Sequence, residues 1–498
     1  MNKYLIVILI MITASCKITE AQVNGTNIME YQFGNIPDAD PEDLSTIYNQ
    51  TNIQYRQNQL RAFARIEQFY STDSIKRDYV SLSQFQLKYS FKKIELKVGN
   101  FYETLGRELL LRSFEIPSSI QEDRIYRVRQ GFYRDIQGVS VNYSGEKFRF
   151  KIVRGKPLYN LIPPGEEDRR TELIEGIQPE YSFWDQNIGI VAMRHNQNGT
   201  NTTYGSIFIE GNLPLNFSYY GEYARNFSQN AEIFNYSSES SYGAYLSLNY
   251  NLKGFGGSFE LKKYQDLFIG SGISDPPTLV KEHSYRLLNR STHVTELFNE
   301  SGYQVELYYT FSDGKRINLN NSKATNKIIK EVNFNEIFLE YYWPFNNGDN
   351  IKSYFDFSRD ELKLEVQRYA GGLYYTHIIK GPWSLAIENE VQIINRSYYP
   401  GNPITNFYGG LSLNKSTKLS ASLYYEFTTD LIVSNKPDTE KTETERYFYG
   451  VGFTYRPNFR NTIILFAGER RGGPACISGI CYEVLDFSGL EIRWTLKF

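Results

Sequence analysis

Apolar and polar residues alternate with a period of two along most of the chain. In one stretch Phe85, Leu87 and Tyr89 are separated by polar residues, so that only one face of the segment is apolar. The same pattern recurs at 94–98, 147–152, 215–219, 362–367 and 418–425. Successive side chains of a β-strand point to opposite faces, so each stretch predicts a strand with one apolar and one polar face. No stretch has a helical period, and we predict an all-β fold.

The connections between these predicted strands are of two kinds. Short turn signals lie at 144–146, 252–254, 312–314, 347–349 and 414–416. Longer polar connections lie at 163–170, 225–241, 271–299 and 428–445. Short turns predict hairpins between antiparallel neighbours. Short turns at one rim and long loops at the other are typical of outer-membrane barrels.

Alternation alone does not distinguish a soluble β-sandwich from a membrane barrel, because both have one polar face. Three further features favour the barrel. The strands are long enough for a tilted bilayer crossing. Aromatic residues gather near strand ends, as in an interfacial belt, at 219–220, 308–309, 341–343, 374–375 and 424–425. The last residues, LEIRWTLKF, form one more amphipathic strand. We therefore predict a transmembrane antiparallel up-and-down β-barrel of about 18 to 22 strands.

Composition narrows the class of partner. Aromatic residues make up 16% of the chain, with 41 Tyr and 33 Phe, which suits strands that meet a membrane boundary. The net charge is only −2, so no strong field favours nucleic acid, and we expect no nucleic-acid partner.

The N-terminal sequence MNKYLIVILIMITASCKITEAQ has a positive residue, an apolar stretch and small residues before Gln22. It predicts a secretory signal peptide over 1–21. A lipidated Cys16 is the alternative. No later apolar run is long enough for a transmembrane helix. We expect a short periplasmic segment at 22–42 and the barrel at 43–498.

Three stretches carry a resemblance to a known family. They are VGNFYETLGRELLLRSFE at 98–115, EYAR at Glu222–Arg225, and the stretch 252–293. In this order they resemble an uncharacterised Bacteroidota family predicted to form outer-membrane β-barrels. The resemblance implies a barrel in the cell outer membrane, surrounded by outer-membrane lipid, and it implies no activity.

The end of the chain also resembles the terminal signal that the barrel-assembly machinery reads. Trp494, Leu496 and Phe498 would form this assembly signal, which makes that machinery an expected partner. We expect the apolar row of 490–498 to face lipid and the strand to pair with the first strand of the barrel.

The segment from Phe101 to Ile116 breaks the strand pattern. It contains three consecutive leucines and charges of both signs, at Glu103, Arg107, Glu108, Arg112 and Glu115. We predict an inward-folded segment whose charges constrict the lumen, as charged rings do in channels. The alternative is an ordinary loop or a short helix at the rim.

Few residues suggest other chemistry. His195, His283, His293 and His377 lack metal-ligand spacing, and we expect them at the surface or an interface. No nucleophile elbow or phosphate-binding loop is present, so we expect no enzyme, no cofactor and no metal. Once the signal is removed, Cys476 and Cys481 remain. Their spacing favours a disulfide in an external loop before the last strand.

The function that these features favour is a passive porin-like channel for small solutes. One alternative is a sealed structural or interaction barrel that partners an outer-membrane secretion or gliding assembly. Another is a transporter of hydrophobic substrates, in which the leucine-rich segment acts as a hatch.

Overall fold

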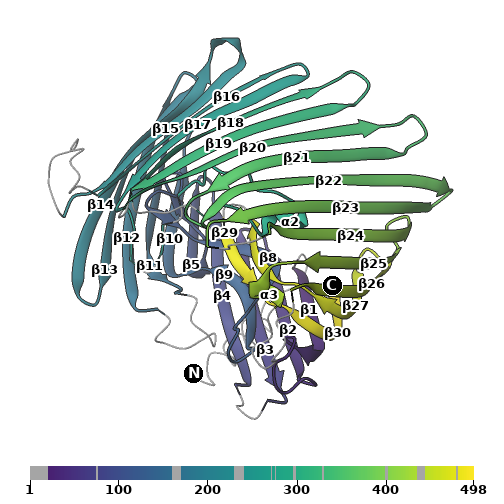
Figure 1. The fold of residues 1–498 in the computed structure, drawn as a ribbon. Coiled ribbons are helices and arrows are strands. Elements are labelled where there is room, and N and C mark those ends of the chain that lie inside the picture. The colour runs from purple at the N-terminus through teal and green to yellow at the C-terminus, as the bar shows by residue number, and fades with distance from the viewer. Residues whose placement is uncertain are drawn as a thin grey trace.

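A computed structural model shows a closed antiparallel β-barrel of 24 strands (Figure 1). It describes residues 21–73, 77–159, 170–228, 241–270, 272–274, 276–294, 299–327, 330–398, 402–434, 444–477 and 480–498. The predicted signal peptide and Cys16 lie outside the described residues, except for residue 21. Among the described residues, no helix is long and apolar enough to cross a membrane.

The wall runs in chain order from β1 to β5, then from β10 to β27, and ends with β30. The first five wall strands are Gln22–Asn35 (β1), Ser45–Gln57 (β2), Leu60–Ser71 (β3), Tyr79–Phe91 (β4) and Ile94–Phe101 (β5). The next eight are Ile136–Ser144 (β10), Phe148–Pro157 (β11), Glu172–Phe183 (β12), Gln186–Gln197 (β13), Thr200–Leu213 (β14), Phe217–Asn226 (β15), Tyr242–Leu252 (β16) and Phe255–Gln265 (β17).

The second half of the wall continues in the same way. Its strands are Glu300–Thr310 (β18), Arg316–Lys327 (β19), Glu331–Pro344 (β20), Asn350–Asp360 (β21), Glu365–Lys380 (β22), Trp383–Arg396 (β23), Ile404–Lys415 (β24), Leu419–Thr428 (β25), Arg446–Asn458 (β26), Asn461–Arg470 (β27) and Phe487–Lys497 (β30). Short elements between wall strands are Thr104–Leu105 (β6), Leu111–Arg112 (β7), Phe114–Glu122 (β8), Arg129–Arg134 (β9), Pro214–Asn216 (η2), Arg286–Asn289 (α2), Leu431–Ser434 (α3), Gly473–Ile477 (β28) and Ile480–Val484 (β29).

The two faces of the wall differ as the alternation predicts. On β20 the inward residues Phe334, Glu336 and Phe338 are buried, whereas the outward residues Ile337 and Leu339 are exposed. Buried inward positions elsewhere carry many polar groups, which is the reverse of a soluble sandwich. The apolar faces therefore form the outside of the barrel.

The connections at the two rims also differ. Turns such as 58–59, 92–93, 253–254 and 381–382 lie at one rim, which also carries the first residue of β1 and the last residue of β30. The opposite rim carries the longest connections, including 102–135, 266–299 and 471–486. We call these the short-turn rim and the long-connection rim. This asymmetry confirms the prediction from turn spacing.

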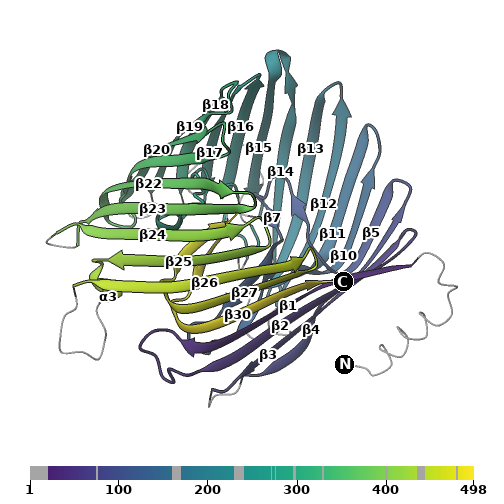
Figure 2. The same cartoon turned by 90° about the vertical axis from the view of Figure 1, so that its right-hand side faces the viewer.

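The seam joins the two ends of the sheet. Strand β30 pairs with β1 in a register that runs from Thr26 opposite Lys497 to Asn35 opposite Ser488, and the two strands lie side by side in Figure 2. Phe498 exchanges two backbone hydrogen bonds with Gly25, at 2.8 and 3.0 Å between nitrogen and oxygen. Leu490 and Trp494 are exposed on the outer face, and Glu491 is buried on the inner face. The predicted closure of the last strand against the first is confirmed.

Three details differ from the sequence predictions. The barrel has 24 strands, more than the roughly 18 to 22 expected. Residues 22–35 form β1 instead of a segment that precedes the barrel, so the wall begins at Gln22 and not at residue 43. The predicted strand at 362–367 begins only at Glu365, because 361–364 form a turn in which Leu364 adopts a φ of 59°.

Candidate functional site

Two chain segments enter the barrel from the long-connection rim. The first inward segment is 102–135, between β5 and β10, and the second inward segment is 266–299, between β17 and β18. Their side chains contact inward-facing residues of the wall, and Figure 1 shows β8, β9 and α2 within the space that the wall encloses. The predicted inward fold of 101–116 is therefore present, and it extends to residue 135.

Glu103 fixes the start of the first inward segment to the wall. Its carboxylate lies 2.7 Å from Lys97 Nζ and 3.3 Å from Lys151 Nζ, and it accepts a hydrogen bond from Ser140 Oγ at 2.9 Å. Burial alone would raise the pKa of Glu103, but Lys151 and Lys97 outweigh burial and lower it. Glu103 is thus held as a carboxylate against three wall strands, β5, β10 and β11.

Gly106 and Arg107 anchor the next turn. The Arg107 backbone N–H donates to Glu222 Oε2 at 2.7 Å, and the Gly106 N–H donates to Gln178 Oε1 at 2.9 Å. The Arg107 guanidinium lies 5.0 Å from the centroid of the Tyr220 ring. Gly106 adopts a φ of 61°, in the left-handed region that favours glycine. Glu222, the first residue of EYAR, therefore anchors the first inward segment to the wall.

The other three predicted charges pair within the segment or with the wall. Arg112 lies 3.1 Å from Glu108, and Glu115 lies 2.5 Å from Arg65 on β3. All five predicted residues therefore belong to the inward segment, but Glu103 and Glu115 are neutralised by wall cations. A ring of free charges does not form from these residues alone. Their role as a constriction stays a prediction.

The leucine-rich stretch is the apolar anchor of the same segment. Leu105, Leu109, Leu110 and Leu111 are at most 1% exposed. They belong to one core cluster with apolar residues of β10–β17, and Leu267, Ile269, Ile273 and Leu279 of the second inward segment belong to it as well. The Arg112 N–H also donates to the Ile273 carbonyl at 2.9 Å. The two inward segments therefore pack against each other.

The second inward segment is tied to the other half of the wall by carboxylates. Glu390 of β23 accepts the backbone N–H groups of Arg286 and Leu287, both at 2.9 Å. Tyr285 donates to Glu340 of β20. The sequence predicted only a long polar connection at 271–299, so this arrangement was not expected. Alternating glutamates on the predicted strands were the available signal, but nothing local identifies their partners.

The histidines lie differently from what was predicted. His195, His283 and His293 are buried, and only His377 is well exposed, with 45% of its side chain accessible. The expectation of surface positions was wrong for the first three, because each pairs with a buried carboxylate. His293 Nδ1 lies 2.9 Å from Asp360. Burial alone would lower the pKa of His293, but hydrogen bonds with Asp360 and Glu300 outweigh burial and raise it.

One histidine lies in a group of metal-type ligands. His283, Glu336 and Asp356 place one ligand atom each within 4.8 Å of one another. The Arg368 guanidinium lies 2.9 Å from Glu336 and 3.1 Å from Asp356. A cation of the protein itself therefore holds the position between the two carboxylates, and the cluster joins the inward segment to the wall.

A third connection, 471–486, contains the hairpin β28–β29 at the long-connection rim. Its backbone register places Cys476 opposite Cys481. The side chains of these two residues lie outside the described part of the structure, so the disulfide stays a prediction. The hairpin lies at the rim opposite the first residue of β1 and the last residue of β30. The external loop with the two cysteines was predicted on this side of the barrel.

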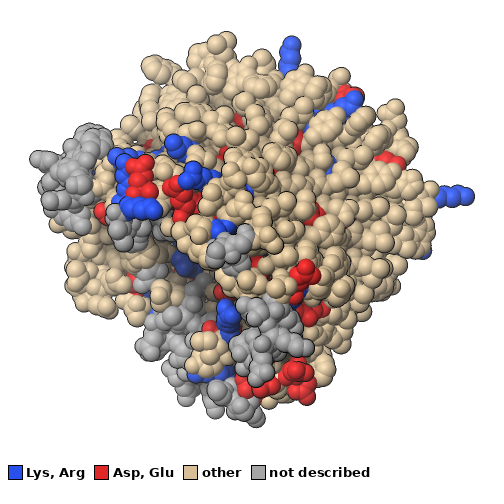
Figure 3. Space-filling view, viewed as in Figure 1, with Lys and Arg blue, Asp and Glu red and all other residues tan. Residues whose placement is uncertain are grey.

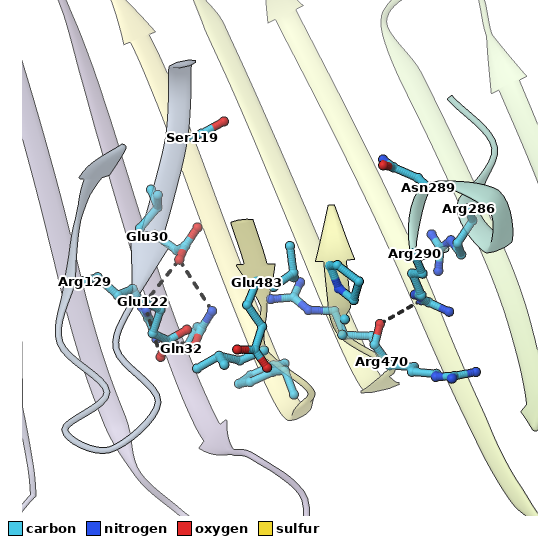
Figure 4. A pocket seen from close by; sticks show the side chains of 18 of the residues that line it. Glu30, Gln32, Ser119, Glu122, Arg129, Arg286, Asn289, Arg290, Arg470 and Glu483 are labelled. Carbon is cyan, nitrogen blue, oxygen red and sulfur yellow. Dashed lines mark hydrogen bonds and ion pairs between the residues drawn. The ribbon is translucent and has the colours of Figure 1, made fainter. Parts of the chain in front are cut away.

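The three connections converge on one pocket beside the seam (Figure 4). Its volume is about 510 Å³, which is within the range of small-molecule sites. Figure 4 shows Glu30, Glu122 and Arg129 on one side and Arg286 and Arg290 of the second inward segment on the other. Six arginines line the pocket, namely Arg129, Arg286, Arg290, Arg470, Arg471 and Arg493. The described residues thus place a cationic pocket where the inward segments meet the seam.

Several of these arginines pair with carboxylates of the wall, and two of them pair with the same one. Arg129 lies 3.4 Å from Glu30, and Arg493 donates to the same residue at 2.7 Å. Arg470 lies 2.6 Å from Glu491 of the last strand. Glu491 and Arg493 alternate with the apolar row of the last strand, which places both on its polar face. Their partners come from distant strands, so only the fold reveals the pocket.

Comparison with solved structures supports the fold. A chain of the E. coli P pilus tip assembly intermediate PapC-PapD-PapK-PapG matches with a TM-score of 0.52 at 10% identity, over 96% of this chain and 61% of that chain. The P pilus usher (PapC) translocation pore matches with a TM-score of 0.45 at 9% identity, over 96% of this chain and 99% of that one. OccK5 (OpdH) of Pseudomonas aeruginosa matches with a TM-score of 0.40 at 12% identity, over 75% and 98% of the two chains. At such identities the likeness concerns the fold alone.

Comparison of the sequence with protein families finds a match to one family. A search of curated proteins finds no match. Residues 194–379 match the model of a family of unknown function (DUF6029). The match runs from the end of β13 into β22 and includes the whole second inward segment. Of the stretches that carried the resemblance, 222–225 and 252–293 lie within it and 98–115 lies before it.

Proposed function

We propose that the protein is an outer-membrane channel for small solutes whose lumen is narrowed by the two inward segments. One observation carries the proposal. Both segments enter from the same rim, attach to opposite halves of the wall, and leave a charged pocket of about 510 Å³ between them at the seam. A passage lined by side chains of both signs selects solutes by size and charge.

The outer face supports a membrane location. Exposed aliphatic side chains recur around the barrel, for example Val98 on β5, Ile207 on β14 and Leu411 on β24. In Figure 3 the face formed by β16–β24 carries few charges, and charged residues gather instead at the left, near β14, and in the lower middle of this view. A continuous apolar face of this kind favours contact with outer-membrane lipid.

Single-channel recording in planar bilayers tests the proposal. We expect discrete conductance steps from the full chain, and larger steps from a variant in which a short Gly-Ser linker replaces 104–133. The matched control carries the same linker at the 198–199 turn, which lies at the same rim but does not enter the barrel. A silent full chain with a conducting 104–133 variant would refute the open channel and favour a sealed barrel.

A sealed structural or interaction barrel is the second candidate. It is favoured by the buried side chains that hold the inward segments to the wall. Arg129 is 1% exposed and hydrogen-bonds Gln32 and Thr46 of the wall, and Arg368 is fully buried beneath the second segment. Side chains held in this way resist displacement by solute. A partner in an outer-membrane secretion or gliding assembly would then contact the long-connection rim.

The remaining expectations receive less support. A hydrophobic-substrate transporter would need leucines that move as a hatch, whereas Leu109–Leu111 are buried against the wall and the second segment. We propose no enzymatic activity. Recognition of 494–498 by the barrel-assembly machinery, and an origin in Bacteroidota, stay predictions that rest on the resemblance.

A further inference from the structure

The side of the pocket that faces α2 carries three guanidinium groups from two chain segments. Arg286 and Arg290 belong to the second inward segment, and Arg471 follows β27. Arg290 Nη2 donates to the carbonyl oxygen of Arg471 at 2.9 Å, which holds the two residues together. Three cations are therefore fixed within one small region by the packing of distant elements.

These cations are only partly compensated. Arg290 and Arg471 share the carboxylate of Glu426 on β25, which lies 3.5 Å from Arg471 Nη1. Two further carboxylates near Arg471 are engaged elsewhere. Asp430 lies 3.1 Å from Arg396, and Asp486 accepts the Gly472 N–H at 2.7 Å. Burial and the neighbouring Arg290 lower the pKa of Arg471, in agreement with incomplete compensation.

Arg286 has no carboxylate partner among the described residues. Its guanidinium lies 4.3 Å from the centroid of the Tyr408 ring and 5.5 Å from that of Tyr424, and it forms no side-chain hydrogen bond with another described residue. Contact with aromatic faces orients a guanidinium but leaves its N–H donors unused. The Arg286 backbone N–H is held by Glu390, so the residue is positioned while its charged end remains available.

On the other side of the pocket each arginine has a carboxylate partner. Glu30 serves Arg129 and Arg493, and Glu491 serves Arg470. Glu122 also lies 3.5 Å from Arg129, although it lies closer to Arg127, at 2.7 Å, and Glu483 lines the pocket as well. The excess positive charge therefore lies on the α2 side, where Arg286 has no carboxylate partner in the described part of the chain and Arg290 shares its partner.

We propose that Arg286 and Arg290 bind the oxyanion of a small solute, a carboxylate or a phosphate, in the pocket between the two inward segments. The planar guanidinium presents paired donors that match two oxygens of such a group. The inference deepens the proposed channel by naming its substrate class. It rests on the proposed function, because a solute reaches the pocket through the channel. Binding to the pocket can be measured without conduction.

Isothermal titration of the purified full chain in detergent tests the site, with inorganic phosphate and succinate as the two probes. We expect at least one probe to bind, and Arg286→Gln to weaken that binding by about tenfold or more. Arg359→Gln is the matched control, because Arg359 is 53% exposed on β21, is not among the residues that line the pocket, and pairs with Glu361. It should bind as the wild type does. Heat-modifiable gel mobility verifies that each variant is folded.

Glu426→Gln provides the opposite perturbation. Removing the shared carboxylate should strengthen binding of the same probe severalfold, since Arg290 and Arg471 then lack compensation. Absence of binding of both probes to the wild type, or equal affinity of Arg286→Gln and the wild type, would overturn the inference. Conductance without anion binding would refute the site alone, and anion binding without conductance would refute the channel alone.

Discussion

The substitution Gly106→Ala tests whether the first inward segment is held by its contact with Glu222. Gly106 adopts a φ of 61°, and a Cβ at this position would overlap the Glu222 carboxylate. That carboxylate accepts hydrogen bonds from the Arg107 N–H at 2.7 Å and from Ser206 Oγ at 2.7 Å. The added methyl group therefore strains the backbone and displaces the acceptor at once.

The size of the effect follows from these two terms. A left-handed conformation costs a non-glycine residue about 1 to 2 kcal/mol. Loss of a hydrogen bond to a charged acceptor costs about 1.5 to 3 kcal/mol. With partial relaxation of the Glu222 side chain, we expect a total of about 3 kcal/mol, which raises the population of the released segment roughly 150-fold.

Hydrogen exchange followed by mass spectrometry measures this population. We expect faster exchange in peptides that cover 102–116 and unchanged exchange in the wall strands. Gly199→Ala is the control, because Gly199 also has a positive φ, of 85°, but its added Cβ meets nothing within 4 Å. If Gly106→Ala and Gly199→Ala show the same exchange, the segment is not held by the Glu222 contact and the reasoning fails.

Three further predictions concern the other connections and the seam. The pKa of His293 is raised, so its pairing with Asp360 stabilises the docked second segment at pH values below the ordinary histidine pKa of about 6.5, and this stabilisation is lost as the pH rises through the folded value. The protection factors of 283–293, which correct exchange for its base-catalysed intrinsic rate, should fall at alkaline pH in the wild type, and His293→Gln should remove this dependence; protection that stays constant with pH in the wild type contradicts the pairing. Deletion of Phe498 should lower the yield of heat-modifiable barrel, and full yield would show that the seam does not need it. Maleimide should label Cys476 and Cys481 only after reduction, whereas labelling beforehand would exclude the disulfide.

The faces of the wall could be predicted from the sequence because strand alternation is local. Residues 85–89 and 490–498 carry their apolar rows on the outer face, as expected. The strand count was too low where the alternation fails. In β1, Ile28 is buried inside while the adjacent Met29 points outward, so two apolar neighbours hide the period. Outward residues are apolar because they contact lipid. The alternation of apolar and polar residues is therefore lost wherever the inward residues are apolar as well.

The candidate site was predictable only in part, for a related reason. The first inward segment was found because three consecutive leucines cannot all face one side of a strand. The second has no such signature, and its anchors are glutamates on strands far along the chain, such as Glu336 and Glu390. Contacts between a loop and a distant strand produce no periodic pattern in the sequence. The arginine pocket was missed because its residues come from wall strands and from both inward segments.

The contacts between the two inward segments determine how far a local release should spread. The first segment is anchored to strands from β1 to β15, and residues from 283 onward are anchored to strands from β18 to β25. Between these anchors, Leu267 and Ile273 belong to the same core cluster as Leu109 and Leu111. Release of the first segment removes the packing partner of 267–273 but none of the carboxylate anchors beyond 283. Gly106→Ala should therefore speed exchange in 267–273 as well as in 102–116 and leave 283–293 protected, so the inward segments open as two units divided near residue 280.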